Sequence, residues 1–96
     1  MDFEWNEAKN ATNIAKHGIQ FADAVRIFDG WTLTVPDDRF DYGEVRKLTT
    51  GVLDGVLLTT IVHTDREHRT RLISARPAST KERKRYEAAL RSAPDR

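Results

Sequence analysis

The sequence predicts a small α+β domain with two N-terminal helices, an antiparallel meander sheet of three to four strands and a C-terminal helix. Three observations predict this order. Residues 7–28 show helical spacing of their apolar side chains, residues 31–75 are rich in alternating and β-branched residues, and residues 80–91 are again strong helix formers. A length of 96 residues fits one domain, which we expect to span 1–96 with a frayed tail at about 92–96.

The first helix begins after Asn6, a good N-cap residue, and ends at Gly18, which follows two basic residues. Three small residues share one face of it, namely Ala8, Ala11 and Ala15. The second helix has Gln20 as a poor N-cap. Its apolar side chains recur at i, i+3, i+4 and i+7, at Phe21, Ala24, Val25 and Phe28.

The β region begins at Trp31 and its first strand is expected to break at Pro36, after which residues 37–43 are predicted as a loop. A second strand at 44–52 and a third at 56–64 flank Asp54-Gly55, a strong signal for a two-residue hairpin turn. Residues 65–67 are predicted to link to a fourth strand at 68–75, and residues 2–5 form a further short strand candidate.

The last helix is predicted from a capping box, in which Ser79 caps the first turn and Glu82 reaches back. Its packing face carries Tyr86, Ala89 and Leu90. The opposite face is basic and is expected to be solvated, with Lys81, Arg83, Lys84 and Arg85.

The composition excludes several classes of protein. Cysteine is absent, which rules out disulfides, thiolate zinc sites and a cysteine nucleophile. Neither a Gly-rich phosphate loop nor a Gly-x-Ser-x-Gly elbow occurs, and the three histidines lack metal-ligand spacing, so we expect no cofactor and no metal. The N-terminus lacks signal-peptide features, and the longest apolar stretch, Val56 to Val62, is too short to cross a bilayer. We therefore expect a cytoplasmic protein that does not contact membranes.

The charge is distributed unevenly along the chain. Residues 1–65 contain six Lys and Arg against eleven Asp and Glu, whereas residues 66–96 contain ten against four. A basic C-terminal third is typical of a surface that binds a polyanion. Internal neutralisation, in which the acidic part folds against the basic part, explains the same pattern equally well.

The arginine series Arg66, Arg69, Arg71 and Arg76 is the strongest local feature. Arg69 and Arg71 point to the same face of a strand and would lie near Val62 and Thr60 if His63 pairs with His68. Two guanidinium groups on one face need water, carboxylates or a phosphate as hydrogen-bond partners. Judged from this segment alone, a solvent-exposed lattice of salt bridges is the favoured interpretation. Arg76 has the opposite parity to Arg71, so a bend or bulge near Ala75 is needed to bring them together.

Two other features allow both a functional and a structural interpretation. Lys16 and His17 could reach a phosphate, but a helix C-terminus also favours them, and local evidence favours that simpler role. The Tyr86 hydroxyl could lie near a phosphate, but a packing role is favoured. Trp5 and Trp31 are expected to be packing residues.

Several segments, in order, resemble the BrnT family of type II toxins: Phe3–Asn10, Lys16–Ile19, Phe21–Phe28, Gly43–Arg46, Val62–Thr64, Arg71–Arg76 and Glu82–Glu87. The resemblance covers residues 2 to 90. It departs from the family pattern at Gln20, where a small hydroxyl residue is usual, and at Pro77, where a basic or polar residue is usual. Neither departure removes a candidate functional side chain.

The resemblance implies a RelE-like ribonuclease fold and an RNA-cleaving toxin. It also implies a BrnA-like antitoxin with a ribbon-helix-helix DNA-binding part, which neutralises the toxin and through which the complex binds operator DNA. The family-like positions are Lys16, His17, Glu44, Arg46, His63, Arg71, Arg76, Glu82 and Tyr86.

We hypothesise metal-independent cleavage of RNA by its own 2′-hydroxyl, which leaves a 2′,3′-cyclic phosphate and a 5′-hydroxyl. Arg46, Arg71 and Arg76 would stabilise the phosphorane, because a guanidinium binds two phosphate oxygens and keeps its charge. Lys16 would steer the substrate, and Tyr86 would lie near the phosphate. Proton transfer is assigned to His17 or His63, with Glu44 as base or as a partner of Arg46. RNA would also be bound by Arg69, Lys81, Arg83, Lys84 and Arg85.

Two non-enzymatic alternatives remain. The basic third could be a module that binds nucleic acid or an acidic partner without cleavage, which predicts retention of RNA or DNA with a steep salt dependence. Alternatively, the chain could be a degenerate toxin that acts only as the structural partner of its repressor.

Overall fold

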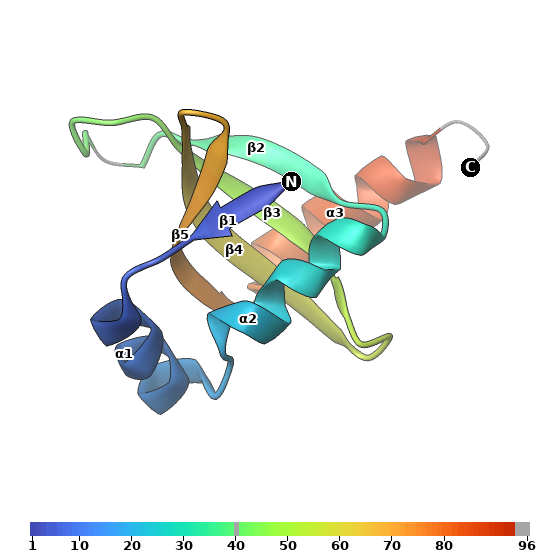
Figure 1. Cartoon of the computed structure of the whole chain (residues 1–96). Coiled ribbons are helices and arrows are strands. Elements are labelled where there is room, and N and C mark those ends of the chain that lie inside the picture. Colours follow the sequence, from blue (N-terminus) through green and yellow to red (C-terminus); the bar gives the residue numbers. More distant parts are fainter. Residues whose placement is uncertain (40, 94–96) are drawn as a thin grey trace.

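The computed structural model describes residues 1–39 and 41–93 (Figure 1). In chain order its elements are β1 (Asp2–Glu4), α1 (Glu7–His17), α2 (Phe21–Ala24), the 3₁₀ helix η1 (Val25–Asp29), β2 (Leu33–Asp37), β3 (Arg46–Leu53), β4 (Leu57–Arg66), β5 (Arg69–Pro77) and α3 (Thr80–Ser92). The α+β class is therefore as predicted. The frayed tail expected from about residue 92 falls mostly on residues 94–96, which lie outside the described residues.

The sheet is mixed and has five strands in the order β1-β5-β4-β3-β2, so the prediction of an antiparallel meander of three to four strands is wrong. Four strands do form a meander. The fifth, β1, pairs in parallel with β5, with Phe3 opposite Thr70. This pairing joins the N-terminal strand to the last strand of the sheet, and three residues are too few to reveal such a long-range pairing by alternation.

The helices cover the two faces of the sheet unequally. In Figure 1, α2 and η1 lie in front of the sheet and α3 lies behind it. The hydrophobic core lies on the front side and consists of Ile19, Phe21, Ala24, Ile27, Leu53, Ile61, Leu72 and Ala75. We call this side the core face, which includes the aligned row Thr49, Ile61 and Ala75, and the opposite side the groove face, which includes the row Leu48, Val62 and Ser74.

A bulge in β5 changes which side chains share a face. Val62 pairs with Ser74, but the next residue, His63, pairs with Leu72, so Ile73 is an extra residue in β5. The bulge restores the parity between Arg71 and Arg76, which therefore both lie on the groove face. The irregularity that the sequence required for these arginines to share a face is present.

The turn between β4 and β5 is tighter than expected. Glu67 and His68, both with positive φ, form it, and Arg66 pairs with Arg69 across it. The expected pairing of His63 with His68 is therefore wrong, and Arg71 lies opposite Thr64 and not beside Thr60. The sequence predicted the link at residues 65–67, and its position was missed because Glu67 and His68 are not the Gly, Asn or Asp residues that usually mark such turns.

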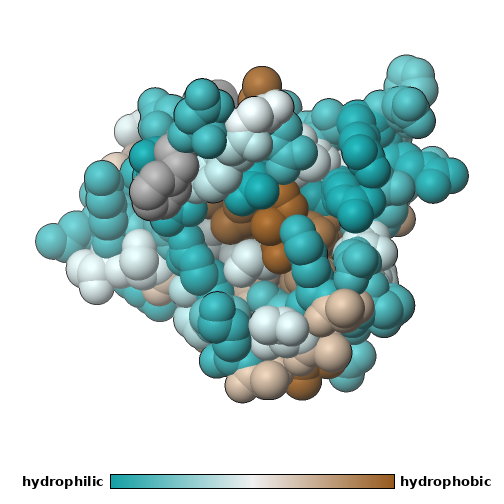
Figure 2. Space-filling view, turned by 90° about the vertical axis from the view of Figure 1, so that its left-hand side faces the viewer, coloured by the Kyte–Doolittle hydropathy of each residue, from teal (hydrophilic) through white to brown (hydrophobic). Residues whose placement is uncertain are grey.

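Helix α1 is held by polar contacts. Its only buried residue is Asn13, which donates to the carbonyls of Ile19 and Ala75, both at 2.8 Å, and accepts from the Ala75 N–H at 3.0 Å. The face that carries Ala8, Ala11 and Ala15 is exposed. Figure 2 shows apolar atoms along the lower rim of the molecule, on the side where α1 lies in Figure 1.

Most local signals are confirmed at the helix ends. Asn6 accepts from the Lys9 N–H, Gly18 has a φ of 72°, and Ser79 and Glu82 form the capping box. Helix α2 has no side-chain cap at Gln20 and passes after four residues into η1.

Pro36 lies within β2, where the edge position tolerates a residue without an N–H. Within the described residues, no helix is long and apolar enough to span a membrane.

Candidate functional site

A groove of about 420 Å³ lies on the groove face, between the end of β2 and the beginning of α3. Leu48 contributes to its floor, and four cationic side chains line it: Arg39, Arg76, Lys81 and Arg85. Asp37, Asp38 and Glu82 also line it. A groove with a partly apolar floor and cationic walls suits a ligand that has flat apolar groups and anionic links.

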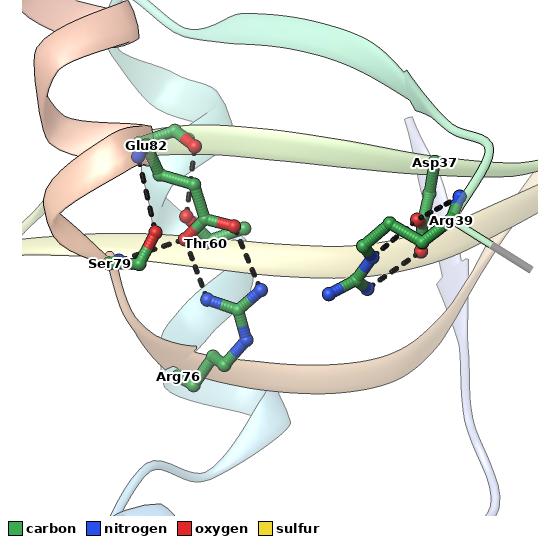
Figure 3. A network of polar contacts seen from close by, with 7 residues as sticks. Asp37, Arg39, Thr60, Arg76, Ser79 and Glu82 are labelled. Atoms are coloured by element: carbon green, nitrogen blue, oxygen red, sulfur yellow. Dashed lines mark hydrogen bonds and ion pairs between the residues drawn. The ribbon is translucent and has the colours of Figure 1, made fainter.

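Arg76 is fixed on this face by Glu82. Its two Nη atoms donate to the two carboxylate oxygens at 2.6 and 2.8 Å, and Glu82 also accepts from the Ser79 N–H at 2.9 Å (Figure 3). Burial opposes ionisation of Glu82, but these bonds outweigh burial and lower its pKa to about 2. The pair therefore remains ionised at neutral pH and holds the Arg76 guanidinium in one orientation.

Arg39 enters the groove from the loop after β2. Its Nε and Nη2 donate to Asp37 at 2.7 and 2.9 Å, and the Tyr42 hydroxyl donates to the same carboxylate at 3.2 Å. The Asp37 side chain is fully buried, and the Arg39 hydrogen bonds lower its pKa. In Figure 3 the Arg39 guanidinium points toward the Arg76–Glu82 pair. The two arginines thus face one groove from opposite walls.

Arg46 and Arg71 lie on the same face as Arg76, two groove-face rows further along the sheet. Arg46 lies opposite Asp37 in the register of β2 and β3. Its Nε donates to Glu44 at 3.0 Å, and its guanidinium carbon lies 3.9 Å from the centroid of the Tyr42 ring. Arg71 pairs with Glu4 of β1. The structure therefore brings the three predicted catalytic arginines to one face, with Arg76 in the groove and the other two beside it.

His63 lies on the opposite face from these arginines. Its Nε2 bonds the Thr49 hydroxyl at 2.7 Å, its Nδ1 bonds Asp65 at 3.0 Å, and its ring contacts Phe28 edge-on. Burial lowers its pKa from the usual 6.5, although Asp65 acts in the other direction. His63 is therefore a neutral residue of the core face, with both ring nitrogens occupied.

Lys16 and His17 line a separate groove of about 340 Å³ between α1 and β5, together with Ile73 and Ser74. Lys16 is exposed and His17 is half-buried. They are not among the residues that line the groove of Arg76.

The remaining predicted residues lie on α3 and at the β4–β5 turn. Tyr86 is buried, stacks edge-on against Trp31 and donates to its carbonyl at 3.4 Å, which is the packing role that local evidence favoured. Lys81 and Arg85 line the groove of Arg76, whereas Arg83 and Lys84 are exposed on α3 without lining it. Arg69 lies beside Glu4.

Sequence reasoning missed Arg39, Asp37 and Tyr42. All three fall in or next to a segment that is polar and rich in turn formers, and neither a helical nor a strand pattern marks them. The alternation Asp-x-Arg at 37–39 was the only signal, and it does not reveal that the carboxylate is buried.

The chain is similar to known ribonuclease toxins. A family model described as the ribonuclease toxin BrnT of type II toxin–antitoxin systems matches residues 5–82. The crystal structure of the Brucella abortus ribonuclease toxin BrnT superposes with a TM-score of 0.68 and 29% sequence identity, over 83% of this chain and 99% of that one. A comparison with the curated proteins found no match. The family match covers most of the chain, and the chain therefore belongs to the BrnT family of ribonuclease toxins of type II toxin–antitoxin systems.

Proposed function

We propose that the protein is a metal-independent endoribonuclease that cuts RNA in the groove of Arg76 by attack of the RNA 2′-hydroxyl. The observation that carries the proposal is the placement of Arg39 and Arg76 on opposite walls of one groove, each held by a carboxylate. Fixed guanidinium groups stabilise charge that develops on a phosphate without reorganising during the reaction.

In this mechanism the scissile phosphate lies between Arg39 and Arg76. The 2′-oxygen forms a bond to phosphorus and the bond to the 5′-oxygen breaks, which gives a 2′,3′-cyclic phosphate and a 5′-hydroxyl. Two carboxylates, Asp37 and Glu82, orient the arginines and keep their charge from repelling one another. Lys81 and Arg85, which also line the groove, bind neighbouring phosphates.

Arg46 and Arg71 extend the same positive surface beyond the groove, and Glu44 orients Arg46. The proton of the 2′-hydroxyl passes to Glu44, which retains exposed surface on the loop before β3, and water returns a proton to the 5′-oxygen. His17 is not given this role, because it lines the separate groove beside α1. His63 supports the core face in this proposal, because its two ring nitrogens are already bonded there.

The family also supports a protein partner. We propose a BrnA-like antitoxin with a ribbon-helix-helix part, which blocks the toxin in the cytoplasm and carries the complex to operator DNA. The free toxin would then inhibit translation and growth by cutting RNA.

The test compares the wild type with a double variant, Arg76→Gln with Glu82→Gln. Replacing both partners avoids an unpaired buried charge, so the variant is expected to fold. We expect wild-type protein to cut RNA in EDTA and to arrest growth, and the double variant to lose about 100- to 1000-fold in kcat. The measurement is gel analysis of RNA cleavage with identification of the product ends.

Arg26→Gln is the matched control. Arg26 is an exposed arginine of η1 that forms ion pairs with Asp23 and Asp54. Cleavage that requires added metal, or that yields 5′-phosphates, would contradict the mechanism. RNA binding without any cleavage by the wild type would instead favour the non-catalytic binding module.

A further inference from the structure

Three guanidinium groups converge on a single carboxylate at the far end of the groove face. Glu4 lies 3.3 Å from Arg66 Nε, 3.7 Å from Arg69 Nη1 and 3.7 Å from Arg71 Nη1. We call Arg66, Arg69 and Arg71 the hairpin arginine cluster, because they flank the β4–β5 turn. The side chains of Arg66 and Arg69 are 59% and 60% exposed, and that of Arg71 is 32% exposed.

The sheet register itself creates this concentration of charge. Arg66 and Arg69 are direct cross-strand partners, and like charges in such positions repel one another. The parallel pairing of β1 then places Glu4 opposite Arg71. An anion that lies between arginines facing each other across a ladder reduces their repulsion and accepts their N–H groups.

Glu4 satisfies this requirement incompletely. Its distances to Arg69 and Arg71 are too long for hydrogen bonds, whereas the Arg76–Glu82 pair is bidentate at 2.6 and 2.8 Å. Among the described residues, Glu4 is the carboxylate at ion-pair distance from all three guanidinium groups, and only Arg66 hydrogen-bonds it, so most of their N–H donors have no hydrogen bond to Glu4. Glu67 lines the same cavity and Asp2 lies opposite Arg69 in the register, so the cluster offers unused N–H donors and not a net positive charge. A cavity of about 500 Å³, lined by Glu4, Arg66, Glu67 and Arg69, lies over this point.

The cluster shares a strand and a face with the groove. The bulge at Ile73 aligns Arg71 with Arg76, and about 20 Å of β5 separates Arg69 from Arg76. That distance exceeds the spacing between neighbouring phosphates of an RNA strand, but a strand of several nucleotides spans it. The two ends of β5 are thus in reach of one extended single strand.

We propose that the hairpin arginine cluster is a second phosphate-binding subsite, which holds the substrate RNA strand several nucleotides from the scissile phosphate. The inference rests on the proposed function only in taking RNA as the ligand. The subsite assigns the substrate class as single-stranded RNA that lies extended along β5. Glu4 occupies part of the subsite and competes with the phosphate.

The test uses two opposite changes to the same subsite. An Arg66→Gln, Arg69→Gln double variant removes two phosphate ligands, and Glu4→Gln removes the competing anion. The matched control is Arg26→Gln, which lies on η1 and not near the cluster. The probes are a labelled 2′-deoxy single strand of roughly ten nucleotides, which cannot be cut by the proposed mechanism, and a dinucleotide.

We expect the double arginine variant to bind the long strand about tenfold more weakly, with a smaller loss for the dinucleotide, and to show a shallower salt dependence. Glu4→Gln is expected to bind the long strand more tightly than the wild type. Circular dichroism shows whether each variant is folded, and the gain expected for Glu4→Gln cannot result from misfolding.

Equal losses for the two probes, or weaker binding by Glu4→Gln, would overturn the subsite. So would variants that keep RNA affinity but lose a protein partner. The outcome is separable from the proposed function. Long-strand binding that depends on the cluster, without any RNA cleavage, would contradict the cleavage mechanism alone, whereas cleavage with unchanged long-strand affinity would contradict the subsite alone.

Discussion

On the core face of the sheet a row of polar side chains forms neutral hydrogen bonds, whereas the groove face adds a buried ion pair to the neutral pair of Thr50 and Thr60. Thr34, Thr49 and His63 are linked by hydrogen bonds of 2.8 and 2.7 Å on the first face. Arg76 and Glu82 are fully charged on the second. The buried ion pair of Arg76 and Glu82 therefore distinguishes the groove face, because hydrogen-bonded neutral threonines occur on both faces.

The difference follows from what covers each face. Helices α2 and η1 pack an apolar layer against the core face. A charge buried there without a partner would lower the stability of the fold, because it loses its hydration. Helix α3 covers the groove face only in part and brings its own carboxylate. The charged side chains of the groove face thus lie beside an open groove, whereas burial on the core face keeps His63 neutral.

The largest effect is expected on the core face. Phe21 is fully buried and stacks edge-on against Trp5, so Phe21→Ala leaves a cavity. We expect the free energy of unfolding to fall by about 3–5 kcal/mol, measured by urea denaturation. A fall below 1 kcal/mol would mean that the packing layer does not dominate stability.

The second largest effect is expected on the groove face, where acid should lower the free energy of unfolding. The pKa of Glu82 is about 2 when folded and returns to about 4.5 on unfolding, so its ion pair stabilises the protein above pH 4.5. This contribution, about 3 kcal/mol, is expected to be lost as the pH falls from 4.5 toward 2. The comparison is between wild type and the Arg76→Gln, Glu82→Gln variant, whose stability should fall less over this range. Parallel curves for the two would refute the assignment.

A smaller effect with a different pH range is expected for His63. Its pKa is lowered in the folded state, so the unfolded chain takes up a proton first as the pH falls below 6.5. Stability is therefore lost below pH 6.5, by at most about 1.4 kcal/mol for each pH unit. His63→Gln should flatten this part of the stability curve. An unchanged slope would show that His63 is not kept neutral.

Local signals were enough to predict the caps at Asn6 and Ser79, because a cap depends only on residues within one turn. They could not predict the role of Asn13, since a single buried amide leaves no periodic pattern. The tight turn at Glu67 and His68 was hidden by its unusual residues, and the error moved the register of β5.

The candidate site was predictable in part for the same reason. Arg71 and Arg76 were singled out by residue type and Arg46 by the family resemblance. For Arg71 and Arg76 to share one face, the sequence required an irregularity, which was expected near Ala75. The bulge at Ile73 supplies it. Arg39 was not predictable, because its position depends on the buried carboxylate of Asp37, which only the folded sheet places.

The contact between Asn13 and Ala75 has a consequence for how copies of this chain behave together. Past Glu4, β1 no longer covers the outer edge of β5, and the Asn13 amide takes the place of a neighbouring strand by bonding both the N–H and the carbonyl of Ala75. An open strand edge is a template for joining molecules into aggregates. Helix α1 therefore covers this part of the edge of β5 against pairing with another molecule, and the Asn13 side chain holds it there.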